Sequence, residues 1–354
     1  MGVIFDLDQT IIDSSIAYHE RRNRNWNNVY SLIPQMQPYQ GVIRLIRKLI
    51  EIGVEVAIVT SSPRPYCIKV LNFLNISTSD VITVCYHDTE KHKPDPEPIT
   101  YAISKMSNQN GKKIIVIGDE EKDVIAANAI GATSIMGFWG NYYAFTNWNN
   151  SIVPNVFCRD EESLLRYFNA RGIDLGKGGL RKRNYHTYQL FDYYPISKVH
   201  DKLSEELFEE VKQRNNRTDF CDAFCSAFEK RKKLIKPDTY GIFVVPSSSA
   251  GKWNKKLTEY VVSRLVQSME LIDCSDHILR HTTHDKQAFG GDRSVQSNLA
   301  TMELQYYLPD QMEGAFIIDD ITTTGNIFEA CKQILCAEGV PRHNIYCAAI
   351  GGTV

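Results

Sequence analysis

Two carboxylates follow an apolar run at the start of the sequence. The stretch VIFDLDQTII, residues 3–12, places Asp6 and Asp8 one residue apart at the end of a predicted β-strand. A carboxylate in such a position can attack phosphorus as a nucleophile, and a second one beside it can protonate the leaving oxygen. The spacing therefore predicts that Asp6 is a nucleophile and that Asp8 is a general acid and base.

Four further polar residues stand where other predicted strands of the first half end. Thr60 ends the stretch VEVAIVT, Lys93 lies in the loop EKHKPDPEP, and Asp119 and Asp123 stand in GDEEKD. Strand ends of a parallel sheet meet at one edge, so we expect these side chains to share a crevice. Converging acids without His or Cys suit Mg²⁺, and we expect Thr60 and Lys93 to hold phosphoryl oxygens there.

The elements that must position these residues are visible as alternating apolar patterns. Strands are expected at residues 3–7, 54–60, 80–86, 112–119 and 133–138, and helices at residues 41–53, 65–76, 97–106, 123–132 and 161–172. Strands that are apolar on both faces and separated by helices indicate a mostly parallel sheet covered on both sides. The first half is thus predicted to be a doubly wound α/β domain.

These motifs together resemble a known family. The ordered set FDLDQT, VTSS, KPDPEP and GDEEKD resembles the four signatures of the haloacid dehalogenase superfamily of phosphohydrolases, over roughly residues 1–170. The resemblance implies Thr60 and Lys93 as phosphate anchors. It also implies Mg²⁺ beside the acids of these motifs, namely Asp6, Asp8, Asp119 and Asp123. One departure is Gln9, which stands where the family commonly has Gly, and we expect it to be tolerated.

The crevice is expected to be poorly covered. Only one excursion, roughly residues 14–38, separates the first two motifs, whereas relatives that act on small metabolites usually carry a larger lid at one of these points. Either the substrate is large, or another segment covers the site. Candidates are the basic segment HERRNRNW, the second domain and the aromatic loop WGNYYAFTNW, for which half-buried surface packing is the alternative.

The second half contains a separate predicted α/β domain of the same doubly wound class. The Gly-rich and basic stretch DLGKGGLRKRN suggests a linker, and we divide the chain into domains 1–172 and 185–354 joined by residues 173–184. Helices are expected at residues 201–214, 219–233, 257–267, 294–308 and 326–339. Strands are expected at residues 241–246, 277–281, 315–320 and 345–350.

A second group of polar residues follows a buried strand in this half. In AFIIDDITTTGNIFEA, Asp319 and Asp320 end the strand, and three threonines and Gly325 lead into a helix. Backbone N–H groups at such a helix start can hold a phosphate. The adjacent acids can hold sugar hydroxyls or, through water, a cation.

This stretch resembles the signature with which type I phosphoribosyltransferases bind phosphoribosyl pyrophosphate. The resemblance implies that Asp319 and Asp320 hold the ribose. Its phosphate would lie on the following loop, at Thr323, Thr324, Gly325 and Asn326. The upstream FVVPSSSAGK corresponds to a pyrophosphate loop with candidates Ser248, Ser249 and Lys252. A hood loop near residues 280–294 would supply three cations, Arg280, Lys286 and Arg293. One departure is Ile327, where the family usually offers a hydroxyl.

Composition and charge set limits on partners and location. The 354 residues carry 40 Lys and Arg against 42 Asp and Glu, so a net charge of −2 gives no global attraction to nucleic acid or membranes. No apolar run approaches the roughly 20 residues that span a bilayer. Nine cysteines without C-x-x-C pairs indicate reduced, packed thiols, with Cys221 and Cys225 in a helix core. We therefore expect a cytoplasmic protein with a small phosphorylated substrate, and the oligomeric state stays open.

Three functions fit the two groups of residues. The first is an Mg²⁺-dependent phosphatase joined to a phosphoribosyltransferase, with a nucleotide or phosphoribosyl pyrophosphate as substrate. The second is a regulatory protein in which the second domain senses phosphoribosyl pyrophosphate or a nucleotide and controls the phosphatase. The third is a phosphatase of proteins or polynucleotides that exploits an open crevice.

Overall fold

The structure is a computed structural model that describes residues 1–107, 113–140, 148–175, 180–184, 186–195, 200–283 and 294–353. The chain forms two compact units. The N-terminal unit comprises Met1–Lys177 and Ile196–Leu203, and the C-terminal unit comprises Gly178–Pro195 and Ser204–Val354. Each unit contains a six-stranded sheet of its own.

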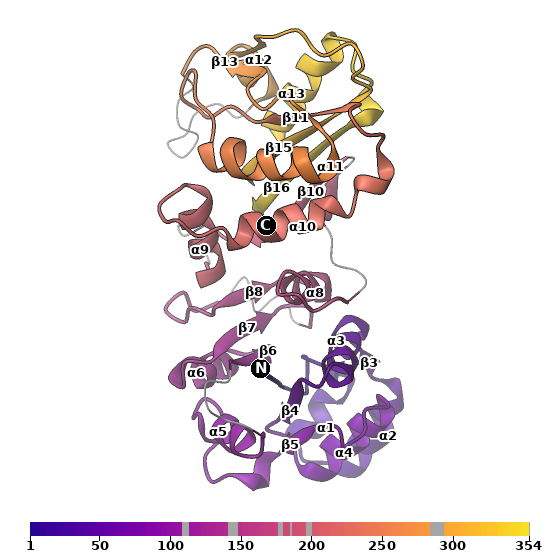
Figure 1. Ribbon diagram of the computed structural model, residues 1–354. Coiled ribbons are helices and arrows are strands. Elements are labelled where there is room, and N and C mark those ends of the chain that lie inside the picture. Colours follow the sequence, from indigo (N-terminus) through magenta and orange to yellow (C-terminus); the bar gives the residue numbers. More distant parts are fainter. Residues whose placement is uncertain are drawn as a thin grey trace. The chain divides into compact units, whose positions relative to one another are not determined.

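The N-terminal unit is built on a parallel sheet in the order β5-β4-β1-β6-β7-β8 (Figure 1). The strands are β1 (Gly2–Phe5), β4 (Glu55–Val59), β5 (Ile82–Val84), β6 (Ile114–Gly118), β7 (Thr133–Gly137) and β8 (Val156–Cys158). The connecting helices are α3 (Gln40–Glu51), α4 (Arg64–Phe73), α5 (Glu97–Ser104), α6 (Glu121–Ala129) and α8 (Glu161–Asn169). Isoleucines and valines fill these strands, and their burial explains why the sheet is covered by helices.

The strand order explains where a site can form in this unit. β1 lies between β4 and β6, so the chain leaves β1 toward one edge of the sheet and returns to build the other edge. Side chains that follow neighbouring strands at such a switch point face one crevice. The predicted doubly wound α/β fold is confirmed for this unit.

A small helical insertion follows β1, and we call residues 14–38 the cap segment. It contains η1 (Ser15–Ala17), α1 (Tyr18–Arg22), α2 (Trp26–Leu32) and η2 (Ile33–Gln35). Two short strands close its base, because β2 (Ile12–Asp13) pairs antiparallel with β3 (Gln37–Pro38). The cap segment is therefore anchored at both ends beside the strand that carries the two acids.

The C-terminal unit has a mixed sheet in the order β12-β11-β15-β16-β10-β9. Its strands are β9 (Arg181–Asn184), β10 (Thr187–Tyr193), β11 (Tyr240–Val244), β12 (Ile272–Asp273), β15 (Gly314–Thr322) and β16 (Ile345–Thr353). A separate antiparallel pair joins β13 (Ile278–Arg280) and β14 (Met302–Leu304). The helical segments are α9 (Lys202–Val211), α10 (Asp219–Glu229), η4 (Lys232–Leu234), η5 (Lys256–Val262), α11 (Ser263–Met269), α12 (Val295–Leu299), α13 (Asn326–Ala337) and η7 (Arg342–Asn344).

Several elements of the second half differ from the prediction, among them β12, which was not predicted. Residues 181–184 of the predicted linker form β9, an edge strand whose basic side chains carry no apolar period. β10 was not predicted, although it pairs parallel with β16. The helix expected at residues 294–308 ends after α12, and residues 302–304 form the strand β14, which pairs with β13 instead of continuing the helix.

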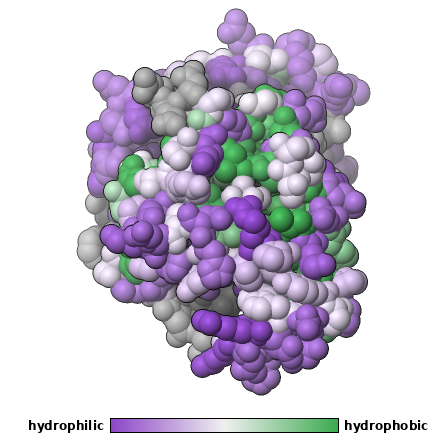
Figure 2. Space-filling view, turned by 90° about the horizontal axis from the view of Figure 1, so that it is seen from below, coloured by the Kyte–Doolittle hydropathy of each residue, from purple (hydrophilic) through white to green (hydrophobic). Residues whose placement is uncertain are grey.

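Packing agrees with the predicted role of the cysteines. Cys221 and Cys225 are completely buried on α10 beside Phe224 and Phe228, as expected. Figure 2 shows one face of the molecule, where hydrophilic residues surround a smaller hydrophobic area. Within the described ranges, every helix is too short or too polar to cross a lipid bilayer.

Candidate active site

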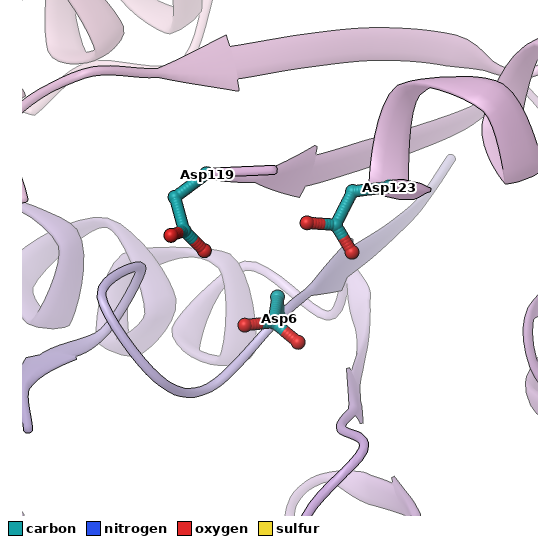
Figure 3. A group of neighbouring side chains, drawn as sticks. All are labelled: Asp6, Asp119 and Asp123. Atoms are coloured by element: carbon teal, nitrogen blue, oxygen red, sulfur yellow. The ribbon is translucent and has the colours of Figure 1, made fainter. Parts of the chain in front are cut away.

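Three carboxylates from separate elements meet at the strand ends of the N-terminal unit. Asp6 follows β1, Asp119 follows β6, and Asp123 stands in the first turn of α6. Figure 3 shows their side chains pointing toward one another. One ligand oxygen from each lies within 4.8 Å of the other two, and all three residues are buried. The predicted convergence of these three acids is therefore present in the structure.

One buried lysine neutralises part of this cluster. Lys93 Nζ lies 2.5 Å from Asp6 Oδ1 and 2.6 Å from Asp123 Oδ1. It also donates a hydrogen bond of 3.0 Å to the carbonyl oxygen of Val59. Burial alone would lower the pKa of Lys93, but the two carboxylates raise it and keep the ammonium charged. Lys93 is thus a fixed charge between two acids.

The cluster carries more negative charge than Lys93 can balance. Burial raises the pKa of Asp6 to about 6, although Lys93 opposes the shift. Burial and the neighbouring carboxylates of Asp6 and Asp123 raise the pKa of Asp119 well above its ordinary value. Three acids and one ammonium leave a deficit of two positive charges. An all-oxygen donor set with that deficit fits a hard divalent cation such as Mg²⁺.

The side chain of Asp8 lies outside the three-acid group and is held by the cap segment, the loop after β4 and α4. Arg21 Nη2 donates to Asp8 Oδ2 at 2.6 Å, and Ser62 Oγ donates to the same oxygen at 2.8 Å. Tyr66 Oη donates to Asp8 Oδ1 at 2.7 Å. The structure therefore orients Asp8 with three donors and does not bring its carboxylate into the group of candidate metal ligands.

The loop after β4 offers small donors beside these acids. Thr60 is buried, and its Oγ1 accepts a hydrogen bond of 3.1 Å from the backbone N–H of Ser62. Its own N–H donates to the carbonyl oxygen of Val84 at 2.9 Å. The Thr60 hydroxyl proton remains available for an anion, so the structure is compatible with the predicted anchoring role.

The turn after Asp8 is tied to the cluster by side chains. Gln9 takes up a left-handed backbone with φ of 60°, the conformation that favours the Gly expected from the family. Tyr39 Oη donates to Gln9 Oε1 at 3.2 Å. Thr10 Oγ1 donates to Asp119 Oδ1 at 3.2 Å, and Trp139 Nε1 donates to the Thr10 carbonyl oxygen at 3.0 Å. These contacts hold the backbone of this turn in the left-handed conformation, although the residue is Gln9 and not glycine.

A cavity of about 860 Å³ opens above the cluster. Asp6, Asp8, Thr60 and Asp119 line it. Cap residues that line it are Ser14, Ser15, Tyr18, Arg21, Arg22, Arg24 and Trp26. Of the candidate covers, the basic segment HERRNRNW thus contributes residues to the wall of the cavity. Residues 141–147 of the aromatic loop lie outside the described residues, and the described Gly140 lines the cavity.

Three residues that hold Asp8 were not singled out from the sequence. Arg21 belongs to the basic segment that was considered as a cover, without a specific role. Ser62 stands in the motif VTSS, and Tyr66 follows it by one helical turn. The available signal was the basic charge next to a pair of acids, but spacing alone could not indicate which arginine reaches Asp8.

A close backbone approach in the site occurs at Gly118, and it gives a testable prediction. A Cβ atom at this position would overlap the side chain of Asp123. We expect Gly118→Ala to displace that carboxylate and to lower kcat/KM for phosphate release by about 100-fold, the scale of an ångström-sized misplacement in an active site. Gly241→Ala is the control, because Gly241 lies in β11 of the other sheet, where a Cβ atom would crowd Met312 instead. Wild-type kinetics in Gly118→Ala would contradict this placement.

A second polar cavity, of about 670 Å³, lies in the C-terminal unit. Ser248, Asp319 and Asp320 are among the residues that line it. Lys212 Nζ donates to Asp320 Oδ2 at 2.5 Å, and Asn254 Nδ2 donates to the same oxygen at 2.7 Å. The cavity thus contains the predicted acidic pair, with one of the two acids already bonded to a lysine and an amide.

The loop that follows the acidic pair leads into α13, as predicted. Gly325 has a φ of +81°, a left-handed value that glycine adopts without strain, and it stands at the helix N-terminus. Arg183 Nη2 donates a hydrogen bond of 2.8 Å to the carbonyl oxygen of Thr323, and this contact fixes the loop backbone at that residue. The helix start has the geometry expected of a phosphate-binding turn.

The expected hood loop is only partly visible. Lys286 and Arg293 lie outside the described residues. Arg280 is 1% exposed, and it donates to the carbonyl oxygen of Ser247 at 2.9 Å and to Asn298 Oδ1 at 3.1 Å. Its guanidinium is therefore held by these hydrogen bonds at the wall of the cavity that Asp319 and Asp320 also line, and its predicted pairing with a diphosphate stays a prediction.

The acidic pair also predicts how stability depends on pH. Burial and Asp320 raise the pKa of Asp319 to about 8, with Lys212 opposing the shift. The folded chain keeps this proton up to about pH 8, whereas the unfolded chain releases it near pH 4. Stability should therefore fall as the pH rises from about 4 to about 8, by at most about 1.4 kcal/mol per pH unit from this group.

We expect Asp319→Asn to weaken this pH dependence. The unfolding midpoint of the variant, measured relative to that of wild type, should therefore be higher at pH 8 than at pH 5. Trp253 lines the same cavity and reports unfolding by fluorescence. Asp310→Asn, at an exposed site, should keep the wild-type pH dependence. Parallel curves for wild type and Asp319→Asn would contradict the raised pKa.

Comparison with known proteins finds a family that part of the N-terminal half resembles. Residues 15–136 match the family model of haloacid dehalogenase-like hydrolases. Pyrophosphatase PpaX from Halalkalibacterium halodurans is 26% identical over 133 residues, which are 37% of this chain and 59% of that protein. Phosphoglycolate phosphatase from Salmonella typhi is 28% identical over 91 residues, which are 26% of this chain and 36% of that protein. The chain thus spans less than two thirds of the length of these relatives.

Solved structures also resemble part of the chain. A hydrolase from Pseudomonas syringae is 19% identical, with a TM-score of 0.40 over 48% of this chain and 97% of that chain. The sequence match supports a haloacid dehalogenase-like domain in the N-terminal half, over residues 15–136. The comparisons give no support for a phosphoribosyltransferase domain in the other half, although a second sheet is present there.

Proposed function

We propose that the N-terminal unit is an Mg²⁺-dependent phosphohydrolase and that residues 1–172 form its domain. The observation that carries this proposal is the buried group of Asp6, Asp119 and Asp123, whose ligand oxygens lie within 4.8 Å of one another beside Lys93. The family match and the two relatives named as phosphatases support the same reaction class.

In this proposal Asp6 is the nucleophile. One Asp6 carboxylate oxygen attacks the phosphorus atom, and the bond from phosphorus to the leaving oxygen breaks. Asp8, held by Arg21, Ser62 and Tyr66, gives its proton to that leaving oxygen. It then takes a proton from the water that hydrolyses the phosphorylated Asp6, so both the nucleophile and the acid are regenerated.

The other residues bind the transferring group and balance its charge. The Thr60 hydroxyl donates to a phosphoryl oxygen, and the Lys93 ammonium offsets charge next to Asp6. Asp6, Asp119 and Asp123 would hold Mg²⁺, which supplies electrostatic stabilisation of the phosphoryl oxygens when it is bound. The names pyrophosphatase and phosphoglycolate phosphatase support a small phosphorylated molecule as the substrate class.

Removal of the metal tests this proposal. Phosphate release from a panel of phosphate monoesters and pyrophosphate should disappear in excess chelator and return with Mg²⁺. Asp119→Asn should raise the Mg²⁺ concentration for half-maximal rate by at least about tenfold, because one of three carboxylates is lost. Phosphate release that is insensitive to chelator would contradict the proposal.

We also infer a second candidate function, the binding of phosphoribosyl pyrophosphate in the C-terminal unit, residues 185–354. Its support is the cavity lined by Asp319, Asp320 and Ser248, with the loop of residues 323–326 at the start of α13. Transfer to a base and sensing without transfer both fit this cavity. Asp320 is bonded to Lys212 and Asn254, so a ribose would have to share or replace these donors.

Calorimetry on the full chain distinguishes these possibilities. Binding of phosphoribosyl pyrophosphate that Asp320→Asn abolishes supports the site. Release of pyrophosphate on addition of a nucleobase then supports a transferase, and binding without release supports a sensor that controls the phosphatase. Absence of binding contradicts both.

A further inference from the structure

The mouth of the N-terminal cavity contains positive charge that the proposed reaction does not use. Two of its cations are already paired, because Arg21 Nη2 lies 2.6 Å from Asp8 Oδ2 and Lys122 Nζ lies 2.5 Å from Glu120 Oε2. Arg22 also lines the cavity and is exposed, and no ion pair joins it to any residue in the described ranges.

Arg24 is a second cation of this cavity without an acidic partner among the described residues. It is exposed and lines the same cavity as Arg22. The guanidinium groups of Arg22 and Arg24 thus line the same cavity, and no acidic side chain of the described residues balances their charge. A solvated surface patch would explain the exposure of both, but not that both line the cavity that contains Asp6.

The backbone fixes these two arginines relative to the catalytic acids. Arg21 donates to Asp8 and Ser62, which ties the end of α1 to the strand ends. Arg24 has a φ of 56°, and its N–H donates to the carbonyl oxygen of Arg21 at 3.0 Å. The turn therefore places Arg22 and Arg24 directly beyond a residue that is itself bonded to Asp8.

Building on the proposed function, we propose that the substrate carries a second phosphate, besides the one that Asp6 attacks, and that Arg22 and Arg24 bind it. A pair of unpaired guanidinium groups matches a dianion in charge, and each can bind two phosphate oxygens at once. A cavity of about 860 Å³ has the size of sites for whole organic ligands. The substrate class is therefore a bisphosphorylated small molecule rather than a simple monoester.

Binding to the Asp6→Asn protein with Mg²⁺ tests this inference without turnover. Two ligand pairs differ by one phosphate: fructose 1,6-bisphosphate with fructose 6-phosphate, and adenosine 3′,5′-bisphosphate with its 5′-monophosphate. We expect the bisphosphate of at least one pair to bind about 10- to 100-fold more tightly, the scale of charge-assisted hydrogen bonds from two arginines. Arg22→Gln with Arg24→Gln should bring the ratio of the two Kd values close to one.

The control is Arg44→Gln, an exposed arginine on α3, which should keep the preference. Equal or absent binding of both members in both pairs would overturn the inference, and so would a preference that survives the double substitution. Wild-type phosphate release is measured separately. A preference for bisphosphates without any phosphate release would support this inference while contradicting the proposed function.

Discussion

Asp6→Asn is expected to abolish phosphate release, with a fall in kcat of at least about 10³-fold, as is typical when a nucleophile is removed. The amide oxygen of the substituted side chain can still accept the hydrogen bond that Lys93 now gives to Asp6 Oδ1, so the fold of the site should persist. An amide cannot form the phosphorylated carboxylate, and the reaction loses its first step. Steady-state phosphate release on the best substrate of the panel measures the effect.

Two observations complete that experiment. Asp80→Asn, at an exposed aspartate in the turn before β5, should keep the wild-type rate. Mass spectrometry of wild-type protein, quenched in acid during turnover, should find phosphate on the peptide that contains Asp6. Full activity in Asp6→Asn would remove the enzymatic interpretation of the N-terminal unit.

Much of the N-terminal fold and its group of acids could be predicted from the sequence, for a physical reason. The strands of this unit are short runs of isoleucine and valine bounded by helices, and a parallel sheet brings their carboxyl ends to one edge. Once Asp6 and Asp119 are placed after strands, topology makes them neighbours. Their approach is therefore encoded locally, by the position of each acid after its strand.

The contacts of Asp8 and Arg280 depend on tertiary structure and could not be predicted in this way. Arg21 reaches Asp8 only because the base of the cap segment is closed by β2 and β3, two strands too short to leave a pattern. Arg280 was predicted, from the family resemblance, to be one of three cations of a hood loop. Its buried side chain extends from β13 to α12 and donates to Asn298 and Thr301, which are distant in sequence.

The second half shows the limit of periodicity more clearly. Residues 294–308 contain apolar residues at helical spacing, yet only α12 is helical, and Met302–Leu304 pair as the strand β14. An edge pairing of three residues decides the outcome, because β14 satisfies the backbone groups of β13. β9 was overlooked for a related reason, since an edge strand with basic side chains has the composition of a linker.

The largest expected effect on stability is at Lys93. Its side chain is 3% exposed and lies between Asp6 and Asp123, so Lys93→Met keeps the volume but leaves two buried carboxylates facing each other. Removing one partner of a buried ion pair costs about 3–5 kcal/mol of unfolding free energy. We expect a loss of this size without Mg²⁺, measured by denaturant unfolding followed by fluorescence, because three of the four tryptophans, Trp26, Trp139 and Trp148, lie in the N-terminal unit.

The response of Lys93→Met to Mg²⁺ distinguishes two roles of the lysine. It is either a purely structural residue, or it balances the charge of acids that also bind the metal. A cation bound by the same acids would replace part of the missing charge, so Mg²⁺ should stabilise the variant more than it stabilises wild type. Lys91→Met is the matched control, because the Lys91 side chain is 71% exposed and its ammonium pairs with Asp95 at 3.3 Å. Such surface pairs contribute up to about 1 kcal/mol. Equal unfolding midpoints for Lys93→Met and wild type in chelator would mean that the buried acids do not repel one another when the lysine charge is removed. The proposed magnesium site would then have to be abandoned.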